Sequence, residues 1–253
     1  MTAVQATGQA DAADAADATG GTHPLDNPAW GSISGAHRHL AEGRAEGAKA
    51  LRYPADISPL AAISAFDDPE AWEQLAGLVA PGETVFFPGP PSLPELVPAG
   101  WTIGMSLPGV QLIATDRLRP RPDPEAVVLG PDDVDEMLDL VARTRPGPFE
   151  RRTVLLGTYL GIRHEGALVA MAGERMHPPG YTEISAVCTD PAFRGRGLAG
   201  RLVLAVAQVI SERGDTPIMH AAAGNTHAIG IYEKLGFTLR WRPTFFDFRT
   251  PGA

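Results

Sequence analysis

Residues 183–200 read Glu-Ile-Ser-Ala-Val-Cys-Thr-Asp-Pro-Ala-Phe-Arg-Gly-Arg-Gly-Leu-Ala-Gly, and this stretch decides the fold. Its first seven residues are mostly apolar or β-branched and predict a strand that ends at Asp190-Pro191. From Leu198 to Ile210, apolar side chains recur at helical spacing, which predicts a helix to about residue 213. A basic, glycine-rich turn therefore connects a strand to a helix.

The turn Arg194-Gly195-Arg196-Gly197 has the chemistry of a phosphate-binding loop. Glycine admits positive φ and lets a ligand approach the backbone closely. The first N–H groups of the following helix lack partners within it, and the helix dipole places about half a positive charge there. A pyrophosphate therefore fits this end of the helix. The Lys-Ser or Lys-Thr of a P-loop and the spacing G-x-G-x-x-G are both absent here.

Two motifs together resemble those of a known family. The turn fits Arg/Gln-x-x-Gly-x-Gly/Ala as Arg194-x-x-Gly197-x-Ala199, directly after a strand that ends Val-Cys-Thr-Asp-Pro. Downstream, Asn225 precedes Tyr232 by seven residues in Asn-Thr-His-Ala-Ile-Gly-Ile-Tyr-Glu-Lys-Leu-Gly-Phe. These motifs resemble the acetyl-CoA motifs of the GNAT superfamily of N-acetyltransferases. The second half of the chain resembles its FR47-like domain, and the resemblance runs from about residue 125 to 250.

Composition narrows the class of protein. The chain has 253 residues, 44% of them hydrophobic, enough for one large domain or two small ones. A net charge of −9 argues against nucleic acid as a partner. Cys188 is the single cysteine, so an intramolecular disulfide is excluded. No apolar run approaches the roughly 18 residues of a membrane helix, and the first basic residue is Arg38. We expect a cytoplasmic protein without a membrane partner or a secretory signal.

The proline-rich segment 119–124 predicts a domain boundary, because proline at alternate positions sustains neither a helix nor a central strand. Residues 1–22 are low in complexity and are predicted to be a disordered tail. Residues 23–118 are predicted to form an N-terminal α/β domain; a degenerate GNAT-like half is one interpretation, carried by no motif. Residues 125–253 are predicted to form the GNAT domain, a mixed α/β sandwich whose central mixed sheet is flanked by helices. The expected helices are 36–50, 69–80, 132–144, 149–156, 198–213 and 225–235. The expected strands are 84–87, 101–107, 109–114, 126–130, 157–164, 167–176, 183–189 and 216–222, and residues 237–249 are expected to form one or two closing strands.

The resemblance implies where acetyl-CoA binds. It assigns the pantetheine arm to residues 187–189, where a backbone N–H polarises the thioester carbonyl, an effect typically worth roughly 3–4 kcal/mol. The assigned cofactor-binding residues are Val187, Cys188, Thr189, Arg194, Gly195, Arg196, Gly197, Leu198, Ala199, Gly200, Asn225 and Tyr232. A period of two places Glu183, Ser185, Val187 and Thr189 on one face of the strand, and Ile184, Ala186 and Cys188 on the other. An acyl-enzyme on Cys188 is a rival idea, but a lone cysteine on a core strand is more often a buried apolar residue.

Three residues are candidates for chemistry. In the family, the tyrosine that matches Tyr232 hydrogen-bonds the departing thiolate; a packing role is the alternative, as a helix N-cap is for Asn225. The general base is Glu183 or His220 by two different family patterns, or neither. Deprotonating a lysine-like amine at pH 7 costs about 4.6 kcal/mol and an α-amine only about 1 kcal/mol, so a weakly basic acceptor needs no base. Glu183 and His220 are expected to border one cleft; structural roles at the strand ends are their alternatives.

These assignments predict direct attack by an amine on acetyl-CoA in a ternary complex, without a covalent intermediate. No metal is expected, because His37 and His39 lack a third ligand nearby. A non-catalytic acyl-CoA-binding regulatory or interaction protein is the rival function. The expected acceptor pocket, residues 145–150 and 241–243, suggests a small polar or amino-acid-like amine, and peptide N-termini stay open. A first half that mediates homodimerisation also stays open.

Overall fold

The protein is described by a computed structural model over residues 23–252, and the tail expected at 1–22 lies outside the described residues. Within them, the prediction of a mixed sheet flanked by helices is confirmed. One sheet has the order β3-β11-β4-β9-β8-β7-β6-β5, with β10 paired to β4. Its strands are β3 (Thr84–Gly89), β4 (Thr102–Ala114), β5 (Ala126–Leu129), β6 (Tyr159–His164), β7 (Ala167–Glu174), β8 (Tyr181–Thr189), β9 (Thr216–Ala222), β10 (Phe237–Trp241) and β11 (Thr244–Arg249). A separate antiparallel pair joins β1 (Ala50–Arg52) and β2 (Ala61–Ile63).

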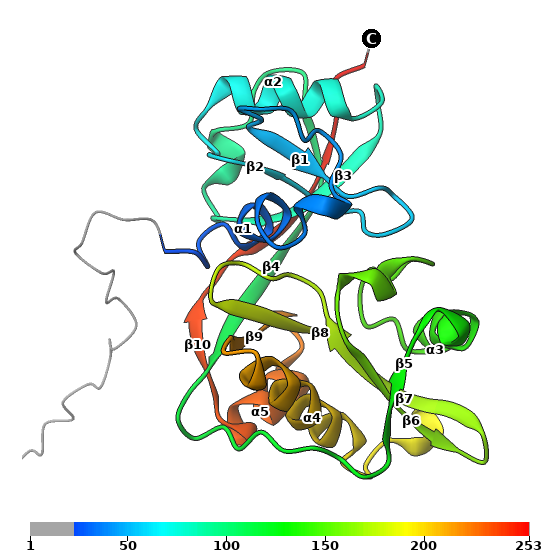
Figure 1. The fold of residues 1–253 in the computed structure, drawn as a ribbon. Coiled ribbons are helices and arrows are strands. Elements are labelled where there is room, and N and C mark those ends of the chain that lie inside the picture. Colours follow the sequence, from blue (N-terminus) through cyan, green and yellow to red (C-terminus); the bar gives the residue numbers. More distant parts are fainter. Residues whose placement is uncertain (1–22, 253) are drawn as a thin grey trace, which may run out of the picture.

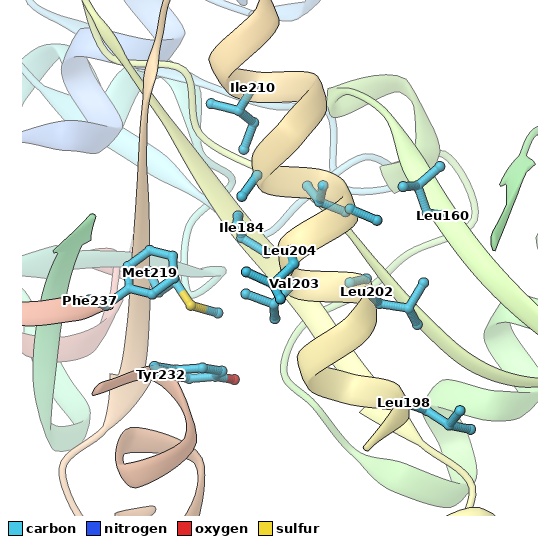
Figure 2. Packing of buried hydrophobic residues seen from close by; sticks show 14 of the residues in the cluster. Leu160, Ile184, Leu198, Leu202, Val203, Leu204, Ile210, Met219, Tyr232 and Phe237 are labelled. Carbon is cyan, nitrogen blue, oxygen red and sulfur yellow. The ribbon is translucent and has the colours of Figure 1, made fainter. Parts of the chain in front are cut away.

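Helices cover both faces of the sheet. The α-helices are α1 (Pro28–Ser34), α2 (Pro69–Leu78), α3 (Val134–Thr144), α4 (Leu198–Glu212) and α5 (Thr226–Leu235), and the short 3₁₀ turns are η1 (Arg38–Leu40), η2 (Leu93–Glu95), η3 (Pro131–Asp133), η4 (Thr153–Leu156) and η5 (Pro191–Phe193). The apolar stripe of α4 packs on Ile184 and Met219 in the main core, which also takes in Tyr232 of α5 (Figure 2). The opposite face, around Met171 and Cys188, packs against α3. No described helix is long and apolar enough to cross a membrane.

Four expected elements differ from those observed. The helix expected at 36–50 is wrong. The short turn η1 is the helical element of this range, and Gly43 and Gly47 adopt φ of +82° and +71°, which a helix cannot contain. The helix of this region is instead α1, started by Asn27, which accepts a hydrogen bond from Trp30 N, and by Pro28 at its first position. The strands expected at 101–107 and 109–114 are one strand, β4. Of the helix expected at 149–156, only η4 forms.

The strands β4 and β11 connect the halves of the molecule. In Figure 1, β4 runs from the N-terminal half down into the C-terminal half, and the C-terminal segment returns upward. There β11 inserts between β3 and β4, while the other edge of β4 pairs with β9. The segment 119–124 contains neither helix nor strand, but the sheet crosses the predicted boundary. The domain division therefore stays a prediction about folding units.

Candidate active site

The site begins where two parallel strands separate. β8 and β9 pair only from Tyr181–Thr216 to Ile184–Met219. Beyond that point β9 continues along β4 to Ala222, and β8 continues along β7. Within the described chain, the edge of residues 185–189 that faces β9 is therefore open. Such a wedge at the carboxyl ends of parallel strands is the usual ligand position in α/β sheets.

A β-bulge at Ala186 shapes this edge. Ala186 has φ of +52°, and the β7–β8 register shifts so that Cys188 pairs with Met171 but Ser185 with Gly173. The extra residue reverses the alternation of side chains. Ile184 lies in the core beneath α4, whereas Ala186 and Cys188 pack in the cluster beneath α3. The prediction that these three share one face is therefore wrong, because a strict period of two holds only in a regular strand.

The thiol of Cys188 is a buried packing group. The residue is 6% exposed, and burial raises the pKa of the thiol to about 11. Because the thiolate is the nucleophilic form, a thiol with this pKa is inert at neutral pH. The geometry argues against an acyl-enzyme on this residue.

The glycine turn and the start of α4 present free donors. Gly195 and Gly197 have φ of +79° and +76°, and a Cβ at either would meet no atom within 4 Å, so the backbone conformation alone requires glycine. Gly197 occupies the N-cap position of α4 but makes no side-chain capping hydrogen bond, so this helix end is uncapped. The first turn of α4 holds no acidic residue. The amides at the start of this helix of 15 residues therefore remain available to an anion.

Two arginines border this helix end. Arg194 and Arg196 are exposed, and no carboxylate within residues 23–252 forms an ion pair with either. The Arg194 guanidinium donates through Nε to Thr189 O at 3.4 Å, and that of Arg196 lies 4.7 Å from the centre of the Phe193 ring. Both charges are free to bind an anionic ligand.

The hydroxyl of Thr189 indicates whether this edge suits a polar, chain-like ligand. Its Oγ1 is buried and has no hydrogen-bond partner among the described residues. Native structures seldom leave such a group unpaired, so an orphaned hydroxyl at the mouth of a wedge fits a site for a polar chain. Polar groups along a pantetheine arm would satisfy it.

Asn225 and Tyr232 lie on α5, beside the wedge. Asn225 is the N-cap, and its Oδ1 accepts a hydrogen bond from Ala228 N at 3.2 Å. Tyr232 is 8% exposed, with its hydroxyl pointing toward α4 (Figure 2). Burial raises the pKa of Tyr232 to about 12, so its hydroxyl stays protonated and can donate a hydrogen bond.

The two base candidates contact each other. His220 Nδ1 lies 2.9 Å from Glu183 Oε1, and the Glu183 carboxylate also accepts from Arg175 NH2 at 2.6 Å and from Arg175 Nε at 2.8 Å. The side chains of Glu183 and His220 are 0% and 1% exposed. They were expected to border one cleft. The structure brings them together at the point where β8 and β9 separate, and it buries both side chains.

Glu183 is held as an anion. Burial alone raises the pKa of its carboxyl, but the charge of Arg175, together with the hydrogen bonds from Arg175 and His220, outweighs that effect and lowers the pKa to about 2. An anion with so low a pKa is a poor proton acceptor. Its geometry suits a structural charge better than a general base.

Sequence reasoning missed Arg175 and Gln111. Gln111 is 0% exposed, and its amide nitrogen lies 3.1 Å from His220 Nε2. The available signal was a polar residue inside an apolar strand, as in Gly109-Val-Gln-Leu-Ile-Ala for Gln111 and at the end of 167–176 for Arg175. A polar residue in such a strand indicates a buried hydrogen-bond network, because a buried polar side chain needs partners.

The remaining predicted positions are the expected acceptor pocket and the histidines considered as metal ligands. Arg145 caps α3 in the left-handed region, Glu150 and Arg242 are exposed, and no hydrogen bond or ion pair within residues 23–252 joins the segments 145–150 and 241–243. His37 is buried with its Nδ1 2.7 Å from Tyr53 Oη. No described group of three His, Cys, Asp or Glu side chains is arranged to hold a metal.

Comparison with known proteins places this geometry in a family. The family model of the FR47-like protein matches residues 159–246. A crystal structure of a putative acetyltransferase from the GNAT family, from Novosphingobium aromaticivorans, is 36% identical with a TM-score of 0.81, covering 90% of this chain and 99% of that one. An uncharacterized protein of Mycobacterium leprae is 29% identical over 214 residues, 78% of this chain and 58% of that protein. A mycothiol acetyltransferase of Corynebacterium glutamicum is 41% identical over 66 residues, 26% of this chain and 23% of that protein.

A mixed sheet that opens between two parallel strands, beside an uncapped helix end, defines an acetyltransferase-type α/β fold. The chain belongs to the GNAT superfamily, with an FR47-like segment in its second half. It spans less than two thirds of the length of each curated relative, 58% and 23%.

The buried anion predicts acid sensitivity. Because the pKa of Glu183 is lower in the folded protein than in the unfolded chain, its stabilisation is complete above pH 4.5 and is lost as the pH falls toward about 2. We expect the free energy of unfolding to lose roughly 3 kcal/mol across that range from this residue alone. Urea unfolding at a series of pH values measures it.

Glu183→Gln isolates the contribution, because other carboxyl groups titrate equally in both proteins. The variant should unfold with roughly 3–5 kcal/mol less free energy at pH 7, since Arg175 keeps a buried charge without its counter-ion, and the difference should shrink in acid. Glu125→Gln, in the partly exposed pair with Arg201, should have little effect. Parallel pH curves for wild type and Glu183→Gln would contradict the assignment.

Proposed function

We propose that the protein is an acetyl-CoA-dependent N-acetyltransferase that acetylates an amine of a small-molecule or amino-acid-like acceptor in a ternary complex. One observation carries the proposal: the open edge of β8 at 185–189 leads directly to the uncapped N-terminus of α4. One part can hold an extended polar arm and the other a pyrophosphate. Membership of the GNAT superfamily supports the same assignment.

The cofactor would be bound mainly by backbone groups. The amides of residues 195–200 and the charges of Arg194 and Arg196 suit the pyrophosphate. Residues 187–189 and the orphaned Thr189 hydroxyl suit the pantetheine arm. Asn225 would keep its capping role at the start of α5 while contributing a further contact to the cofactor.

When bound, acetyl-CoA supplies an acetyl group activated as a thioester. The lone pair of the acceptor nitrogen forms the new C–N bond, the C–S bond breaks, the amine loses one proton and the thiolate takes one up. A free N–H of the β8 edge near Val187 stabilises the oxygen as its negative charge grows. Tyr232 donates a hydrogen bond to the sulfur. Full proton transfer from a tyrosine of pKa about 12 to a thiolate of about 8.5 is uphill by about 5 kcal/mol, so the hydrogen bond persists.

Neither base candidate takes the acceptor's proton directly. Transfer from an α-amine of pKa about 7.8 to a carboxylate of pKa about 2 is uphill by about 8 kcal/mol. The His220 side chain is buried, and its second nitrogen faces Gln111. The acceptor therefore enters as the neutral amine, having lost its proton to solvent, which favours α-amines and other weak bases over lysine-like amines.

The acceptor itself is proposed only as a class. The relative from Corynebacterium glutamicum is named a mycothiol acetyltransferase, which supports a small-molecule acceptor for this chain as well. The burial of Glu183 and His220 is the one feature that fits the rival function, an acyl-CoA-binding protein without chemistry. Turnover separates the two.

The proposed pyrophosphate site at the start of α4 is tested by substituting Gly197, with Gly214 as the control position. Gly197→Asp places a carboxylate among the amides intended for pyrophosphate and should weaken acetyl-CoA binding at least about thirtyfold, the equivalent of about 2 kcal/mol. Gly214→Asp is the matched control, since Gly214 also has positive φ, +90°, in open space. Isothermal titration with acetyl-CoA and with free CoA measures both. If wild type binds neither, the acetyltransferase proposal fails.

Tyr232→Phe tests the chemistry. Loss of the hydrogen bond to the thiolate should lower kcat on the order of a hundredfold and leave the KM for acetyl-CoA nearly unchanged. Thiol release with an amine library gives both constants. Tyr181→Phe, at the opposite end of β8, is the control. An unaltered kcat would assign Tyr232 to packing, and binding by wild type without turnover of any amine would favour the rival function.

The pH dependence tests the absence of a residue base. Across primary amines of increasing basicity, the rising limb of kcat/KM against pH should move with the pKa of each amine, because the neutral fraction falls tenfold for each pH unit below it. Steady-state rates between pH 5 and 10 measure the limb. A limb that stays at one pH for all acceptors would show that an enzyme group accepts the proton.

A further inference from the structure

Gln111 has one amide orientation, fixed by partners that allow no choice. Arg240 NH1 donates to its Oε1 at 2.9 Å, and an arginine has no acceptor. Its Nε2 donates to the carbonyl of Leu25 at 2.9 Å, and a carbonyl has no donor. These two contacts identify which amide atom is oxygen and which is nitrogen. The side chain is fully buried, so water cannot substitute for either partner.

The remaining amide hydrogen is directed at His220. Gln111 Nε2 lies 3.1 Å from His220 Nε2, and because the amide nitrogen only donates, the imidazole nitrogen has to accept. At the other side of the ring, Nδ1 lies 2.9 Å from the Glu183 carboxylate, which only accepts. The two contacts agree: Nδ1 carries the proton and Nε2 carries the lone pair.

We propose that Gln111 is a positioning residue that holds His220 as the neutral imidazole protonated on Nδ1, and thereby fixes the point where β8 and β9 separate. Glu183 lies in the last paired segment of β8, and His220 follows Met219, the last residue of β9 paired with β8. The His220–Glu183 hydrogen bond ties these strands together there, and Gln111 opposite His220 ties β9 to β4.

The charged side chains near this neutral ring form ion pairs with one another. Glu183 is paired with Arg175, and Arg240, which orients Gln111, donates to Asp26 Oδ1 at 2.6 Å. The Phe245 ring also packs near His220, with ring centroids 6.1 Å apart. A proton added to Nε2 would point at a donor. The network therefore selects the neutral form by geometry.

The assignment is read directly by nuclear magnetic resonance. In uniformly ¹⁵N-labelled wild type at pH 7, two-bond ¹H–¹⁵N correlation should show His220 with Nδ1 protonated and Nε2 bare, its signals identified by their loss in His220→Gln. Gln111→Glu replaces the donor by an acceptor and should convert the ring to the doubly protonated form. Gln208→Glu, the same change near the end of α4, should leave the signals unchanged. A wild-type ring protonated on Nε2 would overturn the proposal without any variant.

The expected effect of Gln111 on the rate of acetyl transfer rests on the proposed function and is measured in a separate experiment. Gln111→Met removes the donor without adding charge; kcat should fall tenfold to a hundredfold, as expected for a small misplacement at a reacting site, with the KM for acetyl-CoA unchanged. An unchanged kcat would remove the positioning role and leave the tautomer assignment. If wild type neither binds acetyl-CoA nor acetylates any amine, the proposed function fails, whereas the resonance result stands or falls by itself.

Discussion

The carboxylate of Glu183 is removed from water, and much of the structure around it follows from that constraint. A buried charge is tolerated only when it is paired and hydrogen-bonded. Arg175, one residue beyond β7, supplies two hydrogen bonds, and His220 on β9 supplies a third. The anion therefore gathers three neighbouring strands at one point. The apolar clusters on the two faces make the sheet rigid, but this charge determines which strand positions face each other.

The wedge follows from a second constraint, the bulge at Ala186. Up to Ile184 the backbone of β8 pairs on both sides, and the extra residue then breaks the register with β7 while β9 turns away to follow β4. Backbone donors on an open edge have to find a partner, and a bound chain of alternating polar groups is one. The uncapped start of α4 lies only nine residues beyond Thr189, so both sets of unsatisfied donors are close enough along the chain to suit the one elongated, anionic ligand proposed above.

Much of the fold was predictable because its signals are local. The β8–turn–α4 segment has strand periodicity, two glycines at positive φ and a helical stripe, and the predicted bounds agree with the structure to within two residues. The helix expected at 36–50 failed because Gly43 and Gly47 outweigh a weak apolar period. The bulge was unpredictable from the period of β8 alone, since it exists only relative to β7. Likewise, a polar residue in a strand indicates that it needs a partner, but 109 residues separate Gln111 from its partner His220, and only the sheet order brings their strands together.

The same reasoning gives the N-terminal half a role in the site. Gln111 and Leu25 both precede the proline-rich segment, yet they bond to groups around His220. Further contacts cross in the same region: Thr153 donates to the carbonyl of Ile57 at 2.6 Å, and Gly31 lies so close to Pro178 that a Cβ would approach it to 3.1 Å. An isolated C-terminal half would expose Glu183 and His220 to water and lose the donor that selects the neutral ring. Water would weaken the pairing of Glu183 with Arg175. Whatever folds independently, the geometry at the apex of the wedge therefore depends on both halves together.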